Sequence, residues 1–198
     1  MNRAALITRP ELTMPEAEAN LVRAAYARAE VILEYGSGGS TVMAGEMAGK
    51  RIFSVESDKG WAQGMEAWFA ANPPQSPVEI VHADIGATKE WGHPVDESGW
   101  RRFADYPLGI WESGRMGQPD VVLVDGRFRT GCALATAFHT RRRIPLLFDD
   151  YVQRTHYHKV EELLGAPEIV GRMALFEVAP MAVPAERLSW VIRAMGQP

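Results

Sequence analysis

The chain has 198 residues, of which 46% are hydrophobic and 23% are charged, a composition typical of one globular domain and not of a disordered chain. Its 21 lysine and arginine residues stand against 25 aspartate and glutamate residues, so the formal net charge is −4. Because proteins that bind a phosphate backbone usually carry a basic face, we do not expect nucleic acid as a partner. No apolar run approaches the roughly 20 residues that cross a bilayer, and residues 1–10 resemble no signal peptide. We therefore expect no membrane partner and a cytoplasmic location.

Short β-branched runs alternate with helical patterns along the chain, as in a sheet built from βαβ units. Strands are predicted at 31–35, 51–56, 78–82, 120–125 and 144–149. Helices are predicted over about 15–30, after the glycines at 36–39, around 61–69, over about 130–140 and over 156–164. Two further strands, within 169–178 and at 188–193, are expected to form an antiparallel hairpin. The pattern predicts a single α/β domain over 1–198. Its fold is a doubly wound, Rossmann-like, mostly parallel seven-stranded sheet with a C-terminal antiparallel hairpin, whose ligand lies at the carboxyl ends of the strands.

Residues 85–118 interrupt this rhythm, because they contain few strand signals and many glycines and prolines. The segment holds Trp91, Trp100 and Trp111, and such rings normally find something to pack on. A long irregular segment inside a domain is usually functional or disordered. We interpret 85–118 as a lid-like insertion over the ligand cleft.

The sharpest local signal is the run Glu34–Thr41, which follows a predicted strand and opens a helix. Its glycines let the backbone turn sharply and approach a ligand, although many tight βα turns look the same. Glu56 ends the next strand, 20 residues after Gly36, where a carboxylate can accept both hydroxyls of a ribose. Together the two features favour a cofactor that contains a nucleoside.

The details of the loop favour one such cofactor over another. A dinucleotide fingerprint expects a third glycine where this chain has Thr41. Glu34, just ahead of the loop, would repel a pyrophosphate and attract an ammonium group. S-adenosylmethionine therefore fits better than NAD, and the Tyr-x-x-x-Lys pair that an NAD-dependent oxidoreductase could use is missing.

These motifs resemble those of the class I S-adenosylmethionine-dependent methyltransferases over about residues 31–150. The first motif of that family falls on Glu34, Gly36 and Gly38, with Ser40 in place of the third glycine. The resemblance implies a ribose contact from Glu56, an acid near the adenine, and an acid beside the methyl donor. The cofactor contacts that it implies come from Glu34, Gly36, Ser37, Gly38, Ser40, Thr41, Glu56, Asp84, Ile85 and Asp125.

A narrower resemblance links the chain to metal-dependent small-molecule O-methyltransferases. In those enzymes an acid after the fourth strand joins a pair after the fifth, which here gives Asp125 with Asp149 and Asp150. Three converging carboxylates suit Mg²⁺, which would orient an acceptor hydroxyl and lower its pKa. The alternatives are that the aspartates cap a turn, or that nearby arginines neutralise them.

For catalysis, Asp125 is the expected acid beside the methyl donor, and His156 is the candidate proton acceptor. Arg127 and Arg129 are candidates to bind a carboxylate or phosphate of the substrate, unless they form ordinary salt bridges. The function predicted is methyl transfer from S-adenosylmethionine to a small-molecule substrate. The alternatives are an NAD-dependent oxidoreductase and a non-catalytic S-adenosylmethionine-binding protein of the same fold. The sequence leaves open whether the protein forms a homo-oligomer.

Overall fold

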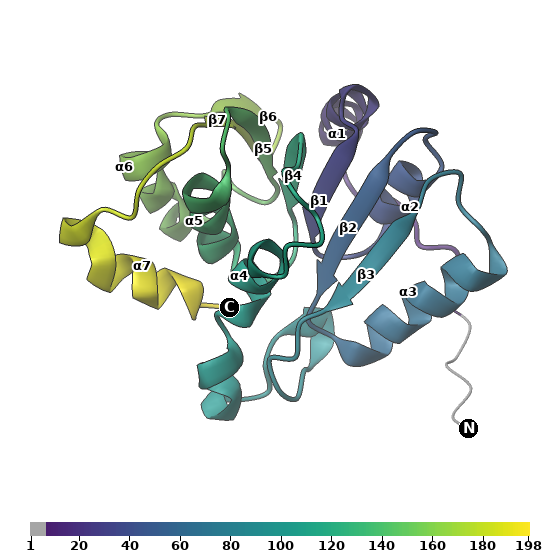
Figure 1. The fold of residues 1–198 in the computed structure, drawn as a ribbon, viewed down its shortest axis with the longest axis horizontal. Coiled ribbons are helices and arrows are strands. Elements are labelled where there is room, and N and C mark those ends of the chain that lie inside the picture. The colour runs from purple at the N-terminus through teal and green to yellow at the C-terminus, as the bar shows by residue number, and fades with distance from the viewer. Residues whose placement is uncertain (1–6) are drawn as a thin grey trace.

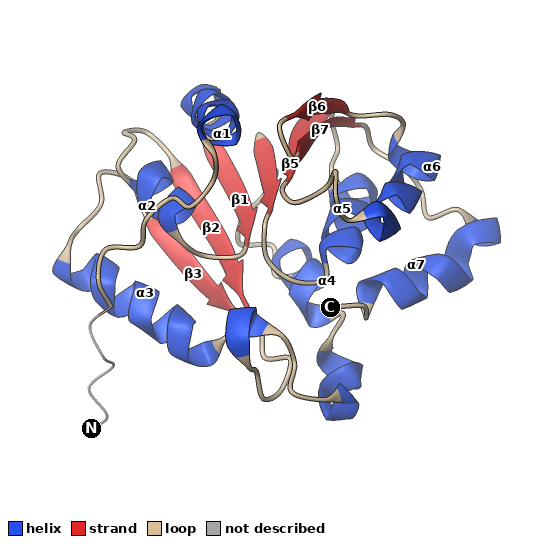
Figure 2. Cartoon of the chain, turned by 180° about the vertical axis from the view of Figure 1, so that it is seen from behind, coloured by secondary structure: helices blue, strands red, loops and turns tan. Residues whose placement is uncertain are grey.

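One sheet of seven strands, in the order β3-β2-β1-β4-β5-β7-β6, forms the centre of the structure. The computed structural model describes residues 7–198, and Figures 1 and 2 show it from opposite sides. The strands are β1 (Val31–Tyr35), β2 (Arg51–Glu56), β3 (Val78–His82), β4 (Val121–Val124), β5 (Ile144–Phe148), β6 (Glu168–Val170) and β7 (Met173–Val178). Neighbours from β3 to β5 are parallel, whereas β7 is antiparallel to both β5 and β6. The predicted seven-stranded, doubly wound fold with a C-terminal hairpin is confirmed.

Helices cover both faces of this sheet. The α-helices are α1 (Glu16–Arg28), α2 (Gly39–Gly45), α3 (Lys59–Ala71), α4 (Asp105–Glu112), α5 (Arg129–His139), α6 (Glu161–Leu164) and α7 (Leu188–Met195). Short 3₁₀-helices are η1 (Glu90–Gly92), η2 (Glu97–Arg102), η3 (Thr155–Val160) and η4 (Ala185–Arg187). Among residues 7–198, no helix has the length and apolar character needed to cross a membrane.

Alternation along the strands divides the core into two layers, because successive side chains of a strand point to opposite faces. Ile32 packs on one face with Val22 and Tyr26 of α1. Leu33 and Tyr35 pack on the other face, in the cluster that also contains buried side chains of α4 and α5. A sheet buried on both sides explains why its central strands read as nearly continuous apolar runs.

The register of the parallel strands determines where the loops that follow them lie. Tyr35, the last residue of β1, is paired with Val55 of β2 and Val124 of β4, and Val124 is paired with Phe148 of β5. The strands therefore end at one edge of the sheet. The glycine loop, the end of β2 and the segments after β4 and β5 all lie at this edge.

The hairpin differs from its predicted place. Both of its strands, β6 and β7, lie between residues 168 and 178, and the predicted strand at 188–193 is wrong because this segment is helix α7. Val191, Ala194 and Met195 are buried against Leu134 and Ala135 of α5, which is helical spacing. A short apolar run reads alike as a strand or as a buried helix, and here packing on α5 selects the helix.

The segment 85–118 contains more regular structure than expected. Tyr106 and Ile110 of α4 are buried in the core, and the indole of Trp111 donates a hydrogen bond to the Tyr35 hydroxyl at 2.8 Å. Trp91 and Trp100, however, are 86% and 62% exposed. The lid-like role of this segment stays a prediction.

The packing of α7 gives a direct test of the helix. Val191→Ala removes a buried side chain and should lower the free energy of unfolding by about 2 kcal/mol. Ile192→Ala is the matched control, because Ile192 is 64% exposed and its truncation should cost less than about 0.5 kcal/mol. Urea unfolding of both variants measures the difference, and equal losses would contradict this packing.

Candidate functional site at the carboxyl edge of the sheet

A cavity of about 1360 Å³ lies at the carboxyl edge of the sheet. Its walls come from residues 7–14, 36–40, 56–58, 89–93 and 125–127, with Trp61, Tyr106, Arg129, Asp150 and Arg154. Sites for one small ligand usually occupy roughly 300–1,000 Å³. The cavity therefore has room for a nucleoside cofactor together with a second small molecule.

The glycine loop between β1 and α2 is held by close backbone contacts. Gly36 has a φ of +101°, and a Cβ added to it would lie 2.8 Å from the Cα of Gly126, so no larger residue fits without strain. A Cβ on Gly39 would lie 2.3 Å from the backbone of Glu11 and of Leu12. The segment 7–14 thus crosses directly over the loop and forms one wall of the cavity.

Glu56, at the end of β2, lies in the cavity wall with its carboxylate held by backbone amides. Its Oε1 accepts hydrogen bonds from the amides of Ser57 and Asp58 at 2.8 and 2.9 Å, and its Oε2 accepts one from Ser37 at 3.2 Å. Burial raises the pKa of Glu56, and these amides oppose the shift. The carboxylate is fixed in orientation and retains lone pairs for further donors.

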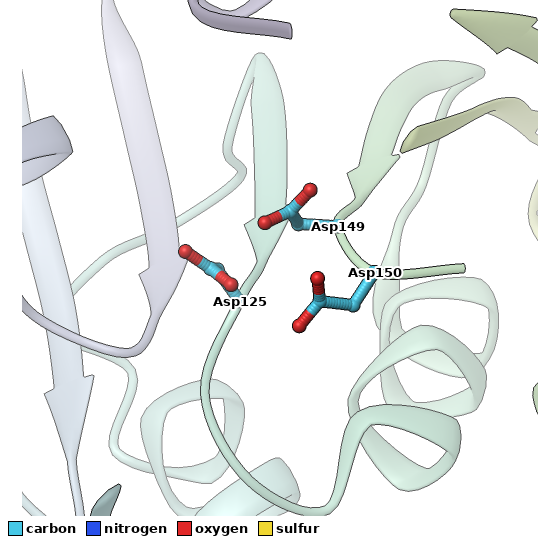
Figure 3. A group of neighbouring side chains, drawn as sticks. All are labelled: Asp125, Asp149 and Asp150. Atoms are coloured by element: carbon cyan, nitrogen blue, oxygen red, sulfur yellow. The ribbon is translucent and has the colours of Figure 1, made fainter. Parts of the chain in front are cut away.

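Three aspartates meet between the ends of β4 and β5, and we call Asp125, Asp149 and Asp150 the acidic cluster. One carboxylate oxygen of each lies within 4.8 Å of the others, and Figure 3 shows their carboxylates gathered at one place. Asp125 follows β4, whereas the other two follow β5. The pattern of the sequence therefore predicted this convergence correctly.

Guanidinium groups surround the acidic cluster, and we call Arg129, Arg154 and Arg172 the arginine set. Arg172, in the turn between β6 and β7, donates to both oxygens of Asp149 at 3.0 and 2.6 Å, and its Nε lies 3.2 Å from Asp150. Arg154 donates to Asp150 at 2.8 Å. Burial alone would raise the pKa of Asp149, but the hydrogen bonds and charge of Arg172 hold it below its usual value.

Arg129 is buried beside the acidic cluster, but it does not keep the pKa of Asp125 at its usual value. It lies 3.3 Å from the Asp125 carboxylate and 3.5 Å from that of Asp150. Burial raises the pKa of Asp125 to about 7; Arg129 opposes this shift, and the charges of Asp149 and Asp150 add to it. Asp125 can therefore exchange a proton near neutral pH.

The predicted site residues divide into those that line the cavity and those that do not. Lining it are Gly36, Ser37, Gly38, Ser40, Glu56, Asp125 and Asp150. Outside its walls lie Glu34, Thr41, Asp84, Ile85, Asp149 and His156. The predicted roles of both groups stay hypotheses, and the surroundings of the second group are as follows.

Glu34 and Thr41 support the loop from below and do not face the cavity. Glu34 is fully buried on the α1 side of the sheet, where its Oε1 accepts a hydrogen bond from the Tyr26 hydroxyl at 2.6 Å. Burial raises the pKa of Glu34. The Thr41 hydroxyl accepts a hydrogen bond from the Gly38 amide at 2.9 Å. Both side chains therefore position the loop.

The other four predicted site residues outside the cavity walls have different surroundings. Asp84 is exposed and forms an ion pair with Arg102, and Ile85 is buried in the core. His156 is exposed in η3, with its ring 4.1 Å from that of Tyr157, so it is not placed to take a proton in the cavity. Asp149 is closed off from the cavity by its pairing with Arg172.

Some wall residues had no recognisable signal in the sequence. Residues 7–14 precede the first predicted helix and carry no ligand-binding motif. His93, which the sequence leaves without a role, lines the cavity and contacts Arg127. Arg172 reaches the acidic cluster from a turn distant in the chain, which only the folded topology reveals.

Known structures resemble the chain closely in one case and distantly in others. No model of a protein family matches the chain, and no curated protein matches it. A methyltransferase-like protein from Silicibacter pomeroyi is 59% identical, with 96% of this chain and 99% of that chain covered and a TM-score of 0.93.

Two distant structures share the fold. The O-methyltransferase TomG from Streptomyces achromogenes, in complex with S-adenosylmethionine, is 14% identical, with 85% of this chain and 82% of that chain covered and a TM-score of 0.56. An O-methyltransferase from Bacillus cereus, in complex with S-adenosylhomocysteine, is 13% identical, with 89% and 85% covered and a TM-score of 0.54.

The contact between the glycine loop and Gly126 can be tested by stability. Gly36→Ala forces a side chain into a positive φ and against backbone atoms, so the free energy of unfolding should fall by about 1–3 kcal/mol. Gly38→Ala is the control, because a Cβ there meets nothing within 4 Å, and its loss should be less than half as large. Chemical unfolding of the ligand-free proteins measures both, and a neutral Gly36→Ala would contradict the contact.

Proposed function

The chain belongs to the S-adenosylmethionine-dependent methyltransferases, and from this we propose that it transfers the methyl group of that cofactor to a small-molecule acceptor. Identity of 59% over 96% of the chain establishes the family. The observation that carries the proposal is that the glycine loop, Glu56 and Asp125 line one cavity large enough for two ligands. The net charge of −4 argues against a nucleic acid as the acceptor.

The residues at one end of the cavity fit the cofactor. At Gly38 the absence of a side chain leaves open space, Gly36 lets the loop turn closely against Gly126, and Glu56 offers a fixed carboxylate to the ribose hydroxyls. Ser37 and Asp58 lie beside that carboxylate. When bound, S-adenosylmethionine supplies a methyl group on a positively charged sulfur, which makes it an electrophile.

Asp125 is the residue that we propose takes the proton of the acceptor, in place of His156. Its carboxylate lines the cavity, and a base with a pKa near the working pH is efficient. When the acceptor's oxygen or nitrogen takes the methyl group, Asp125 would receive the proton of the acceptor, and the cofactor would leave as S-adenosylhomocysteine. The other contribution of the chain is alignment of the reactants in a closed cavity.

The acidic cluster does not fit a divalent cation as it stands. Mg²⁺ requires oxygen ligands with free lone pairs directed at it, but the oxygens of Asp149 and Asp150 face Arg172 and Arg154. The three positive charges of the arginine set equal or exceed the negative charge of the cluster, because Asp125, with its pKa raised to about 7, is only partly ionised at neutral pH. A divalent ion would then add uncompensated positive charge among guanidinium groups, which is unfavourable in a buried site. We therefore propose methyl transfer that does not depend on Mg²⁺.

Cofactor binding tests the proposed function. Titration calorimetry should show binding of S-adenosylmethionine and S-adenosylhomocysteine, no binding of NAD, and the same affinities with Mg²⁺ or EDTA. Glu56→Gln should weaken both sulfur cofactors by about tenfold or more, because hydrogen bonds to a charged group are worth about 1.5–3 kcal/mol. The control Glu66→Gln changes an exposed acid of α3 that does not line the cavity, and should bind as the parent does.

Other outcomes of this titration favour the other functions. Binding of NAD alone would favour the oxidoreductase, and affinity that requires Mg²⁺ would restore the metal site. Tight binding without methylation of any hydroxyl or amine in an acceptor panel would favour a binding protein.

The pH dependence of turnover tests Asp125. Because its carboxyl pKa is raised to about 7, the ionised base forms as pH rises through that value. The rate of S-adenosylhomocysteine release should therefore increase up to about pH 7 and then level off. Asp125→Asn should lower the rate by about 10²–10⁴-fold and abolish this pH dependence, while Glu66→Gln keeps both. An unchanged profile in Asp125→Asn would assign the proton transfer to another group.

A further inference from the structure

Arg127 is a cation in the cavity wall that the acidic cluster does not neutralise. The ion pairs of this region join the acidic cluster to the arginine set, and within residues 7–198 none of them includes Arg127. Its Nε is buried and has no hydrogen-bond partner in that part of the chain. Its Nη1 instead contacts Nε2 of His93. A partly buried guanidinium without an acidic partner is unfavourable, so this arrangement favours a negative charge from outside the chain.

The surroundings of His93 point the same way. Burial lowers the pKa of His93, and the positive charges of Arg127, Lys89, Arg154 and Arg129 lower it further. Burial and the charge of Arg129 likewise lower the pKa of Arg127. Four cationic side chains, Lys89, Arg127, Arg129 and Arg154, thus line this part of the cavity, although the protein as a whole is acidic.

The position of Arg127 relates this positive region to the reacting groups. Gly126 touches Gly36 of the glycine loop, so the next residue borders the place proposed for the cofactor. Asp125, the proposed base, is two residues away in the same loop. A group bound by Arg127 would therefore hold a molecule beside both the methyl donor and the base.

We propose that Arg127 and His93 bind an oxyanion, a carboxylate or a phosphate, that is carried by the methyl acceptor. The inference rests on the proposed function. The planar guanidinium can donate two parallel hydrogen bonds to such a group. Nε2 of His93 accepts from Arg127, so the neutral imidazole carries its proton on Nδ1, which provides a third donor. The cofactor brings an ammonium and a sulfonium charge with its own carboxylate, so it adds net positive charge. The acceptor is then the molecule that supplies the balancing negative charge.

Calorimetry with small probes tests separately whether the site binds a carboxylate or a phosphate. Benzoate and inorganic phosphate are titrated into the free protein and into the protein loaded with S-adenosylhomocysteine, with benzamide as the neutral probe. We expect saturable binding of at least one anion at concentrations up to about 50 mM, typical of weak single-group contacts, and none of benzamide. Arg127→Gln should weaken this binding at least tenfold, and Arg127→Lys should restore part of it.

The control variant is Arg23→Gln, which removes the same charge from an exposed position on α1 and should bind the anions as the parent does. Stability provides a second readout, because loss of an unneutralised cation should leave the melting temperature unchanged or raise it. A marked fall in melting temperature in Arg127→Gln, with anion binding intact, would make Arg127 structural and overturn the inference.

Comparison of S-adenosylhomocysteine with 5′-methylthioadenosine, which lacks the aminoacyl end, identifies the source. If Arg127→Gln weakens only S-adenosylhomocysteine, the oxyanion belongs to the cofactor and the inference is overturned. If S-adenosylhomocysteine binds but neither anion does, the inference fails and the proposed function stands. If an anion binds at Arg127 but neither sulfur cofactor binds, the oxyanion site is supported and the proposed function fails.

Discussion

The ion pair between buried Asp149 and Arg172 connects the parallel strands of the sheet to its antiparallel hairpin. Asp149 follows the last parallel strand, β5, and Arg172 lies in the turn of the antiparallel hairpin. The backbone amide of Arg172 also donates to Glu18 of α1 at 2.7 Å. Removing one member of a buried ion pair leaves an uncompensated charge, at a cost of about 3–5 kcal/mol. The hairpin, β5 and α1 therefore keep one arrangement, and the edge that forms the cavity keeps its shape.

Arg129 extends this order to the loop after β4. Its guanidinium donates to the backbone oxygens of Gly126, Asp149 and Asp125 at 3.0, 2.5 and 3.1 Å. With its donors used in this way, Arg129 is a fixed part of the scaffold. The same region thus contains two kinds of arginine: those that hold carboxylates of the chain itself, and Arg127, whose charge is left for a ligand. Sequence alone does not distinguish them, because Arg127 and Arg129 stand two residues apart.

The strength of the local signals explains what the sequence predicts well. The strands 31–35 and 51–56 contain β-branched and aromatic residues, are bounded by turn residues and are buried on both faces. Their pattern therefore predicts a strand and nothing else, and the ends of these strands place the glycine loop and Glu56. The run 188–193 is short and borders no glycine or proline, so its conformation depends on packing against α5. Glu34 matches a motif by position, but the alternation of β1 turns its side chain toward α1. Contacts made through tertiary structure, such as Arg172 with Asp149, leave no mark in the local sequence.

The crossing of the glycine loop by residues 7–14 has a practical consequence for handling the protein. This segment lies against Gly39 and forms a wall of the cavity, and Arg9 pairs with Glu46 at 2.7 Å on the outside. A purification tag or fluorescent label attached at the amino end would therefore be only a few residues along the chain from a wall of the binding cavity. The other end of the chain follows α7, which packs on α5 and contributes no residue to the cavity walls. Labels for binding measurements belong at the carboxyl end.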